Sequence, residues 1–415
     1  MSPSVRILLV IGYVWPEPNS SAAGGYLMSL MRLFREDGWK VHFASPAARG
    51  EHECDLHAEG ISSHEIALNC SSFDAFVSEL QPEVVLFDRF MMEEQFGWRV
   101  AQTCPQALRM LDMEDFHSLR HARHEAVKKG LSYREAELFT EKAQREVAAI
   151  FRCDLSLVIS EVERELLISQ YQVPAELLIW CPFLLDPNEK VVPAFHEREH
   201  FLSIGNFRHA PNWDAVLWLQ QEIWPLIRKE LPEAELHIYG AYPPPKARQL
   251  HQPKDGFLIK GWATDARIVM SRARLCLAPL RFGAGLKGKL MEAMLCGTPS
   301  VTTSVGAEGI PGTLLWPGAL ADDVADFAKQ AIALSTDEGE WQLRQARGQD
   351  ILVHRFAREE IGSRVLSQMK LCCKDLEAHR RKNFIGQMLQ HQSMKATQYM
   401  SQWIEAKNQS GVELF

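Results

Sequence analysis

The residues with the clearest chemical potential form a loop rich in glycine and lysine. The loop lies in residues 281–308, which read RFGAGLKGKLMEAMLCGTPSVTTSVGAE. Glycines let backbone amides approach a ligand closely, and lysine side chains add positive charge to such a cradle. The positions concerned are Gly283, Ala284, Gly285, Leu286, Lys287, Gly288 and Lys289. A loop of this composition is suited to binding an anion, most simply a pyrophosphate.

The elements around this loop would position it well for that purpose. Residues 275–280 form an apolar run of strand length, and residues 290–294 place apolar side chains on one helical face. Gly297 and Pro299 then end the helix, and residues 299–304 read as the next strand. A strand, loop, helix and strand in this order bring free backbone amides and the positive end of a helix to the loop.

The rest of the second half repeats the alternation of strands and helices. Short strands are predicted at residues 201–205, 234–239 and 257–260, each ending at or beside a glycine. In a doubly wound parallel sheet, the turns at the carboxyl ends of the strands converge on one edge and bind ligands there. The residues marking these turns are Gly205, Gly240, Gly261 with Trp262, and Gly283.

One rival interpretation is a nicotinamide or flavin dinucleotide site. Residues 283–288 satisfy the pattern G-x-G-x-x-G, and Glu308 lies downstream of it. That fingerprint usually opens the first strand-helix unit of its domain, whereas several units precede it here. Glu308 also lies beyond Ser304, past the end of the next strand. The dinucleotide interpretation is therefore the less favoured one.

Residues 279–301 resemble the nucleotide-sugar loop of retaining GT-B glycosyltransferases of the GT4 type, the glycosyl transferases group 1. In that family two glutamates separated by seven residues bracket the loop. The first holds hexose hydroxyls and the second holds the nucleotide ribose. Glu292 matches the second glutamate, whereas the first position is Ala284. The alternative for Glu292 is an ion pair with Lys289 on the helix surface.

The resemblance also implies how the bond to the donor would be broken. Lys287, together with Arg208 in the turn after residue 205, would stabilise the negative charge that grows on the departing diphosphate. A solvated loop arginine is the alternative for Arg208. The chain contains no Asp-x-Asp sequence, so a metal-independent reaction is expected. No cofactor is expected beyond the nucleotide sugar itself.

The first half keeps the same α/β alternation, with strands predicted at residues 5–15, 41–45, 84–88, 107–111 and 155–160. The first of these runs could be taken for a signal peptide, but only Arg6 precedes it as a basic residue. A helix follows it after Gly24 and Gly25, which we place on the acceptor side of the site. Residues 114–151 are expected to be largely helical, because Gly130 is almost the only helix breaker among them.

Residues 112–120 gather acids, a histidine and an arginine just after a probable strand. Asp112 and His117 are candidates to orient the acceptor or the sugar, and Asp115 and Arg120 are candidates on the acceptor side. Helix capping and ordinary surface polarity are the alternative for them. The segment 117–134 is also the most basic of the chain, so it is predicted to contact an anionic acceptor or an anionic membrane, with a solvated helix face as the alternative.

Length and composition limit the architecture and the partners. The 415 residues predict two domains and a terminal appendage, with a junction between residues 186 and 199. The resemblance implies that residues 1–190 bind the acceptor, that residues 200–360 bind the donor, and that a helical segment follows at 361–415. The last segment is expected to cross back onto the first domain, and the part beyond residue 382 to serve dimerisation, membrane docking or core packing. A net charge of −8 makes nucleic acid an unlikely partner. Nine scattered cysteines favour a reducing compartment, and no apolar run is long enough to cross a membrane.

These observations predict an α/β protein of GT-B architecture, with two Rossmann-like domains that face each other across a cleft. The function expected from the resemblance is transfer of a hexose from a nucleotide diphosphate to a hydroxyl acceptor with retention, for a polysaccharide, glycolipid or similar glycan. A location in the cytoplasm, including the inner face of the membrane, is expected. A sugar-nucleotide epimerase and a non-catalytic nucleotide-sugar binding protein are the alternatives.

Overall fold

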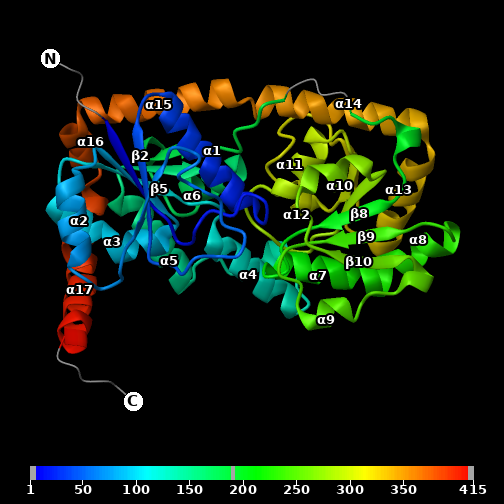
Figure 1. The fold of residues 1–415 in the computed structure, drawn as a ribbon, viewed down its shortest axis with the longest axis horizontal. Coiled ribbons are helices and arrows are strands. Elements are labelled where there is room, and N and C mark those ends of the chain that lie inside the picture. The colour runs from blue at the N-terminus through cyan, green and yellow to red at the C-terminus, as the bar shows by residue number, and fades with distance from the viewer. Residues whose placement is uncertain (1–5, 188–191, 410–415) are drawn as a thin grey trace.

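The computed structural model describes residues 6–187 and 192–409, without the side chains of residues 392–396. Two parallel sheets lie side by side, and long helices run along the top of both (Figure 1). The predicted junction between residues 186 and 199 includes 188–191, which lie outside the described residues. The predicted domain limits stay predictions.

The first sheet has seven strands among the described residues, in the order β3-β2-β1-β4-β5-β6-β7, and all its pairings are parallel. The strands are β1 (Ile7–Ile11), β2 (Lys40–Ser45), β3 (Ser62–Glu65), β4 (Val84–Asp88), β5 (Leu108–Asp112), β6 (Leu155–Val158) and β7 (Leu178–Trp180). The helices between them are α1 (Ala22–Glu36), α2 (Ser72–Leu80), α3 (Phe90–Thr103), α4 (His117–Lys128), α5 (Glu141–Arg152) and α6 (Glu161–Ser169).

The second sheet has six strands among the described residues, in the order β10-β9-β8-β11-β12-β13, again all parallel. They are β8 (Phe201–Ile204), β9 (Leu236–Tyr239), β10 (Phe257–Gly261), β11 (Leu275–Ala278), β12 (Ser300–Thr302) and β13 (Gly318–Leu320). The helices are α7 (Ala210–Trp218), α8 (Trp224–Glu230), α9 (Pro245–Arg248), α10 (Ala266–Arg272), α11 (Gly288–Leu295), α12 (Ser304–Ala307), α13 (Val324–Thr336) and α14 (Glu338–Arg355).

Continuous apolar runs make the central strands because helices cover both faces of the first sheet. Leu8 and Val10 of β1 pack into one hydrophobic cluster, whereas Leu9 and Ile11 pack into another on the opposite face. All five residues of β4 are buried. The predicted strand at 84–88 is therefore confirmed with its bounds.

The expected helical stretch at 114–151 is wrong in its middle. It forms α4 and α5, separated by Gly130 at φ +74°, a short 3₁₀ turn η1 (Tyr133–Glu135) and a loop. The loop ends at Thr140, whose hydroxyl accepts from the amide of Ala143 and so starts α5. A glycine in the left-handed region ends the first helix, and the threonine cap fixes the start of the next.

The C-terminal helices cross back onto the first half, as predicted. They are α15 (Arg358–Lys374), α16 (Leu376–Lys382) and α17 (Phe384–Gln409). The backbone of Leu185 is bonded to both Phe356 and Arg358, and Lys370 pairs with Asp37 at 2.7 Å. Figure 1 shows α14 over the second half and α15 over the first. Among the described residues, no helix combines the length and the apolar character needed to cross a membrane.

Candidate functional site

The glycine loop connects β11 to α11 and lies where the two halves of the chain meet. A Cβ atom built on Gly288 would lie 2.3 Å from the Cβ of Ala22, at the start of α1. One built on Gly285, whose φ is +60°, would lie 2.7 Å from the Cβ of Asp115. Side chains at these two positions would collide with the first half. The glycines therefore let the loop pack tightly against the facing domain.

Lys287 is buried inside this contact, with 8% of its surface exposed. Its Nζ donates to the carbonyl oxygen of Gly285 at 2.8 Å. Burial lowers the pKa of Lys287 to about 8, although the negative charges of Glu308 and Glu163 oppose the shift. At neutral pH the amine keeps most of its charge. Because little water screens it, that charge acts strongly on an anion brought to the loop.

Lys289 and Glu292 lie on α11, beside the turn that follows β8. The Nζ of Lys289 donates to the Oδ1 of Asn212 at 2.7 Å, and burial lowers its pKa to about 8. Burial also raises the pKa of Glu292. Within the described part of the chain, the Glu292 carboxylate makes no hydrogen bond or ion pair, and the charges of Arg267 and Lys289 only partly oppose the effect of burial on its pKa. The surface pair with Lys289, which was the alternative for Glu292, is therefore not formed.

The predicted turns after β8, β9 and β10 do meet at one edge of the second sheet. A Cβ on Gly205 would lie 2.8 Å from the Nζ of Lys289, and one on Gly240 would lie 2.1 Å from the carbonyl oxygen of Gly205. The amide of Gly240 in turn donates to the carbonyl of Gly261 at 2.8 Å. Gly261 has φ +79° and open space beside it, and the adjacent Trp262 is 39% exposed.

Arg208 follows β8 but is held by an aromatic ring. Its guanidinium carbon lies 3.5 Å from the ring centroid of Tyr242. The Tyr242 hydroxyl donates to the two carboxylate oxygens of Glu17 at 2.9 and 3.0 Å, and the Trp262 indole donates to the carbonyl of Asn19 at 3.3 Å. These three hydrogen bonds join the two halves. Arg208 therefore stacks on a tyrosine that takes part in a contact between the two halves.

Glu163, on α6 of the first half, reaches across to the glycine loop. Its Oε1 accepts from the amide of Gly285 at 2.6 Å, and its side chain is fully buried. Burial raises its pKa to about 8, helped by the charge of Asp115. The amide of Gly285 is thus occupied by a carboxylate of the same chain, which corrects the expectation of uniformly free loop amides.

Arg123 and Glu308 form a second bridge between the halves. The two guanidinium nitrogens bond the two carboxylate oxygens at 2.8 and 3.0 Å, and Nη1 also donates to the carbonyl of Gly283 at 2.8 Å. Glu308 is thereby engaged with an arginine, which weakens the rival interpretation of it as a ribose-binding acid. Because Arg123 is buried in this bridge, it is not part of a free basic surface at residues 117–134.

Three acids lie together at the carboxyl ends of β4 and β5. Ligand atoms of Asp88, Asp112 and Glu114 lie within 4.8 Å of one another, and all three groups are buried. Burial and the neighbouring Asp88 raise the pKa of Asp112 to about 8, and burial also raises that of Glu114. Arg89, whose Nε lies 3.5 Å from Asp88, supplies a nearby positive charge. The raised pKa of Asp112 and the charge of this arginine both reduce the negative charge of the cluster at neutral pH.

The pKa of Asp115 is lowered, although Asp115 lies only three positions after Asp112, whose pKa is raised. Burial disfavours its ionised form, but Arg120, His117 and Arg89 outweigh burial and lower its pKa to about 2. Arg120 forms an ion pair with it. The structure therefore brings Asp115 and Arg120 together on the face that meets the glycine loop.

His117 is occupied by structural contacts at the start of α4. Its backbone amide donates to Oε1 of Glu146 at 2.9 Å, and its ring Nδ1 lies 2.8 Å from the carbonyl oxygen of Asp115. These contacts correspond to the helix-capping alternative for this histidine. Gly24 also serves packing, since a Cβ there would lie 2.7 Å from the backbone of Glu17, whereas Gly25 has more room.

Comparison with known proteins shows the fold, and one family matches the segment that contains the glycine loop. Residues 198–337 match the family described as glycosyl transferases group 1. No curated protein matches the chain. Sucrose-phosphate synthase from Thermosynechococcus elongatus is similar with a TM-score of 0.66 and 16% identity, over 90% of this chain and 99% of that one. HepE from Anabaena, solved with UDP and glucose, has a TM-score of 0.68 and 14% identity, over 88% of this chain and 99% of HepE. TarM has a TM-score of 0.67 and 9% identity, over 89% of this chain and 99% of TarM. The chain thus has the predicted GT-B fold.

Sequence reasoning located the loop and its neighbouring turns, and it missed the residues that reach the loop from the first half. The signal for Glu163 was present in its position just after a buried strand, where an α/β site is built. The pairing of Arg123 with Glu308 left no such signal, because 185 residues separate them. The roles predicted for Lys287, Lys289, Glu292, Arg208 and Asp112 stay predictions.

Proposed function

We propose that this protein is a retaining glycosyltransferase that moves a hexose from a nucleotide diphosphate to a hydroxyl acceptor. The observation that carries the proposal is a pair of buried lysines, Lys287 and Lys289, on the glycine loop of a GT-B fold. The family match over residues 198–337 contains this loop. The donor binds to the second half and the acceptor to the first.

The lysines supply the chemistry that this reaction needs most. When the bond between sugar and phosphate loosens, negative charge grows on the diphosphate and positive charge on the sugar ring. Lys287 and Lys289 stabilise the diphosphate from a buried position, where fixed charges need no rearrangement. Glu292, whose carboxylate makes no hydrogen bond or ion pair in the described structure, can accept hydrogen bonds from the hydroxyls of the nucleotide ribose.

The acceptor side contributes both a protonated acid and an ionised one. Asp112, whose pKa is raised to about 8, holds a proton at neutral pH and can donate a hydrogen bond to an acceptor hydroxyl. Burial also raises the pKa of the neighbouring Glu114. Asp115 stays ionised and fixes Arg120 beside the loop. His117 orients this segment through its backbone and ring contacts rather than by touching the sugar.

The first experiment is a thermal shift panel of UDP, GDP, ADP, TDP and NAD. Ligand binding to the folded state raises the melting temperature, so the panel identifies the nucleotide class directly. HepE was solved with UDP-glucose, so UDP is the first compound to test. Stabilisation by NAD and by none of the diphosphates would overturn the proposal in favour of a dinucleotide enzyme.

The second experiment follows a radiolabelled nucleotide sugar with and without cell extract. Label transferred to a product only when extract supplies an acceptor supports the glycosyltransferase. Isomerisation of the sugar without extract identifies an epimerase, and neither outcome in a protein that binds the nucleotide identifies a binding module. We expect EDTA to leave turnover intact, because lysines take the part of a cation. Loss of turnover that manganese or magnesium restores would direct attention to Asp88, Asp112 and Glu114.

A further inference from the structure

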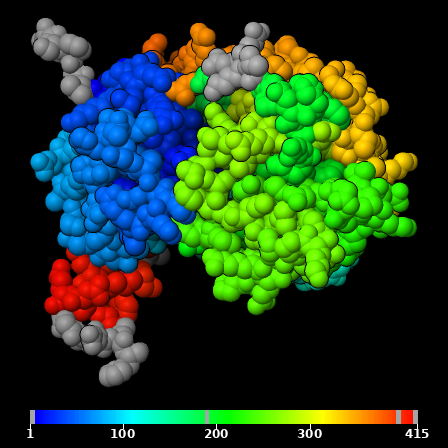
Figure 2. Space-filling view, turned by 45° about the vertical axis from the view of Figure 1, so that its right-hand side comes forward, coloured from blue at the N-terminus to red at the C-terminus, as the bar shows by residue number. Residues whose placement is uncertain are grey.

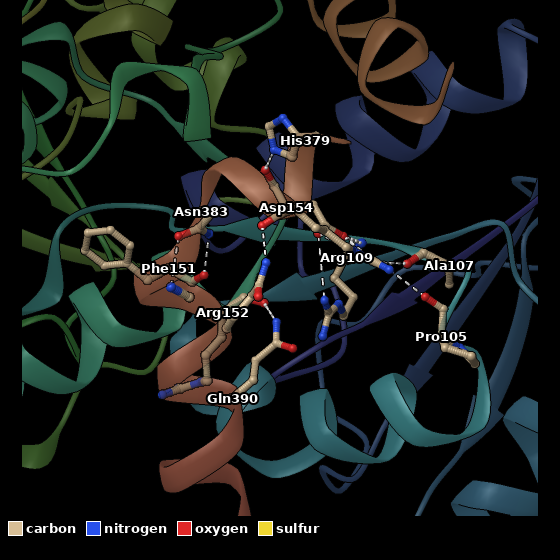
Figure 3. A network of polar contacts seen from close by, with 12 residues as sticks. Pro105, Ala107, Arg109, Phe151, Arg152, Asp154, His379, Asn383 and Gln390 are labelled. Carbon is tan, nitrogen blue, oxygen red and sulfur yellow. Dashed lines mark hydrogen bonds and ion pairs between the residues drawn. The ribbon is translucent and has the colours of Figure 1, made fainter. Parts of the chain in front are cut away.

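The C-terminal helices are anchored firmly to the first half (Figure 3). Arg380 of α16 pairs with Asp154, from Nε to Oδ1 at 2.7 Å and from Nη2 to Oδ2 at 2.8 Å. The same guanidinium donates to the carbonyls of Pro105 and Ala107 at 2.6 and 2.8 Å. Asp154 is 3% exposed, so this bidentate pair is shielded from water.

One face of α17 continues this attachment along the helix. Asn383, just before α17, donates to the backbone carbonyl of Phe151 at 2.8 Å, and Gln390 on α17 donates to that of Arg152 at 2.9 Å. Farther along, the hydroxyl of Ser401 donates to Asn69 at 2.8 Å. Glu405 accepts from the amide of Ser71 at 3.1 Å. The helix is therefore a fixed arm, which stands out from the first half in Figure 2.

The opposite face of α17 is apolar and open. At 100° per residue, Phe384, Met388, Tyr399 and Trp403 fall within an arc of about 100°. Gly386 and Ser401, which are buried, fall on the other side. The exposed fractions of the large apolar side chains on α17 are 66% for Phe384, 51% for Ile385, 49% for Met388, 64% for Tyr399, 58% for Met400 and 57% for Trp403. We call these six residues the apolar face.

Basic residues stand at both ends of the apolar face. Arg381 and Lys382 precede Phe384, and the Nζ of Lys407 lies 4.8 Å from the ring centroid of Trp403. Arg381 pairs with Glu377, but both side chains are more than 70% exposed, so the pair neutralises little. Glu405 belongs to the attached face, and the described part of the apolar face carries no acid.

The positive charge at both ends of the apolar face indicates which kind of partner covers it. Two copies of the chain paired through the apolar face would set Lys382 against Lys382 in a parallel arrangement, or against Lys407 in an antiparallel one. Either arrangement opposes like charges. An anionic surface complements both ends at once, and tyrosine and tryptophan settle at the boundary between lipid head groups and acyl chains.

We propose that α17 docks the protein on an anionic lipid surface, with the apolar face inserted at the head-group boundary and Arg381, Lys382 and Lys407 over the anionic head groups. The site differs from the predicted contact at residues 117–134, where Arg123 is buried and Arg120 is paired. The proposal does not depend on the sugar chemistry, so it can fail or succeed independently of the proposed function.

The test is co-sedimentation of the full chain with vesicles of phosphatidylcholine containing about a third phosphatidylglycerol, a composition at which each basic residue adds about 1 kcal/mol. We expect binding to these vesicles and weaker binding to phosphatidylcholine alone. Tyr399→Ser with Trp403→Ser should weaken binding to the anionic vesicles by tenfold or more, since two large apolar side chains leave the lipid. Arg381→Gln with Lys382→Gln should weaken it by roughly five- to twentyfold and leave the weak binding to neutral vesicles unchanged.

Leu315→Ser is the matched control, because Leu315 is 66% exposed but lies in the second half. It should bind like the wild type. Failure of the wild type to bind the anionic vesicles, or equal losses for the control and the α17 variants, overturns the proposal. So does a concentration-dependent dimer in analytical ultracentrifugation that Tyr399→Ser with Trp403→Ser abolishes, because the apolar face would then be covered by a second copy. The charge variant decides the matter if the double serine variant does not fold.

Discussion

The two edges that face each other across the molecule handle buried charge in different ways. On the second sheet, Lys287 and Lys289 are each bonded to a neutral oxygen, of Gly285 and of Asn212. On the first sheet, Asp112 and Glu114 crowd against Asp88, and burial raises their pKa values. The lysines of the second sheet stay mostly charged at neutral pH, whereas Asp112 on the first sheet stays mostly protonated. The difference is what we expect of the proposed reaction, which would release a diphosphate at the lysine edge and receive a hydroxyl at the acidic edge.

The largest effect should come from Lys287, the most enclosed cation of the loop. We expect Lys287→Ala to lower kcat by about 100- to 1,000-fold, the usual loss when one stabilising donor is removed from a developing anion. Binding of both the nucleotide diphosphate and free pyrophosphate should weaken. Lys289→Ala is the matched comparison and should cost about tenfold, because its amine already bonds Asn212. Steady-state kinetics and calorimetry of both variants provide the measurement, and equal losses would erase the distinction between the two lysines.

Glu292 tests whether the same edge also recognises the nucleoside. Hydrogen bonds to a charged group contribute about 1.5 to 3 kcal/mol, so Glu292→Ala should weaken nucleotide-sugar binding by about 10- to 150-fold. Affinity for free pyrophosphate should stay unchanged, because the lysines remain. The comparison is made by calorimetry with both ligands. If a folded Glu292→Ala variant binds the nucleotide as tightly as wild type does, Glu292 does not touch it.

The lysine edge also predicts a dependence of binding on pH. The pKa values of Lys287 and Lys289 are lowered to about 8, and a bound diphosphate favours their protonated forms. Above pH 8 the protein must take up protons to bind, so affinity should fall by up to about tenfold per pH unit for each lysine. Calorimetry at pH 8.5 in two buffers of different ionisation enthalpy measures this uptake. Lys287→Met should remove part of it, and an unchanged uptake would show that another group titrates.

The residues at the edge of the second sheet could be predicted from the sequence better than those at the edge of the first sheet, for a physical reason. The loop and α11 are specified by local signals, namely a strand, glycines and an amphipathic helix, all within residues 275–297. The charge state of Glu163 depends on a contact with Gly285, 122 residues away, and on burial that no local pattern reports. The contact between Arg123 and Gly283 likewise exists only because the first half packs against the glycine loop of the second half. His117 looked like an acceptor ligand because its capping partner, Glu146, is remote in sequence.

The smallest and most diagnostic effect concerns two acids of the first edge, Asp112 and Asp115, whose pKa values move in opposite directions. That of Asp112 is raised to about 8, so its contribution to stability is greatest at low pH and is lost as the pH rises from about 4 to 8. Asp112→Asn keeps the oxygen that accepts from the amide of Glu114 and removes this loss. The variant should gain melting temperature over wild type across that window, by about 1 °C for each kcal/mol recovered in a chain of 415 residues.

Asp115→Asn is the matched control, and it should show the reverse trend. The pKa of Asp115 is lowered to about 2, chiefly because Arg120 outweighs burial, so the stability it supplies is present above about pH 4 and is lost as the pH falls toward 2. The variant should therefore melt below wild type at neutral pH and approach it in acid. Melting curves of the three proteins from pH 3 to 9 decide the point. Parallel curves for the two variants would mean that the edge does not separate a protonated acid from an ionised one, and the contrast between the two edges would lose its basis.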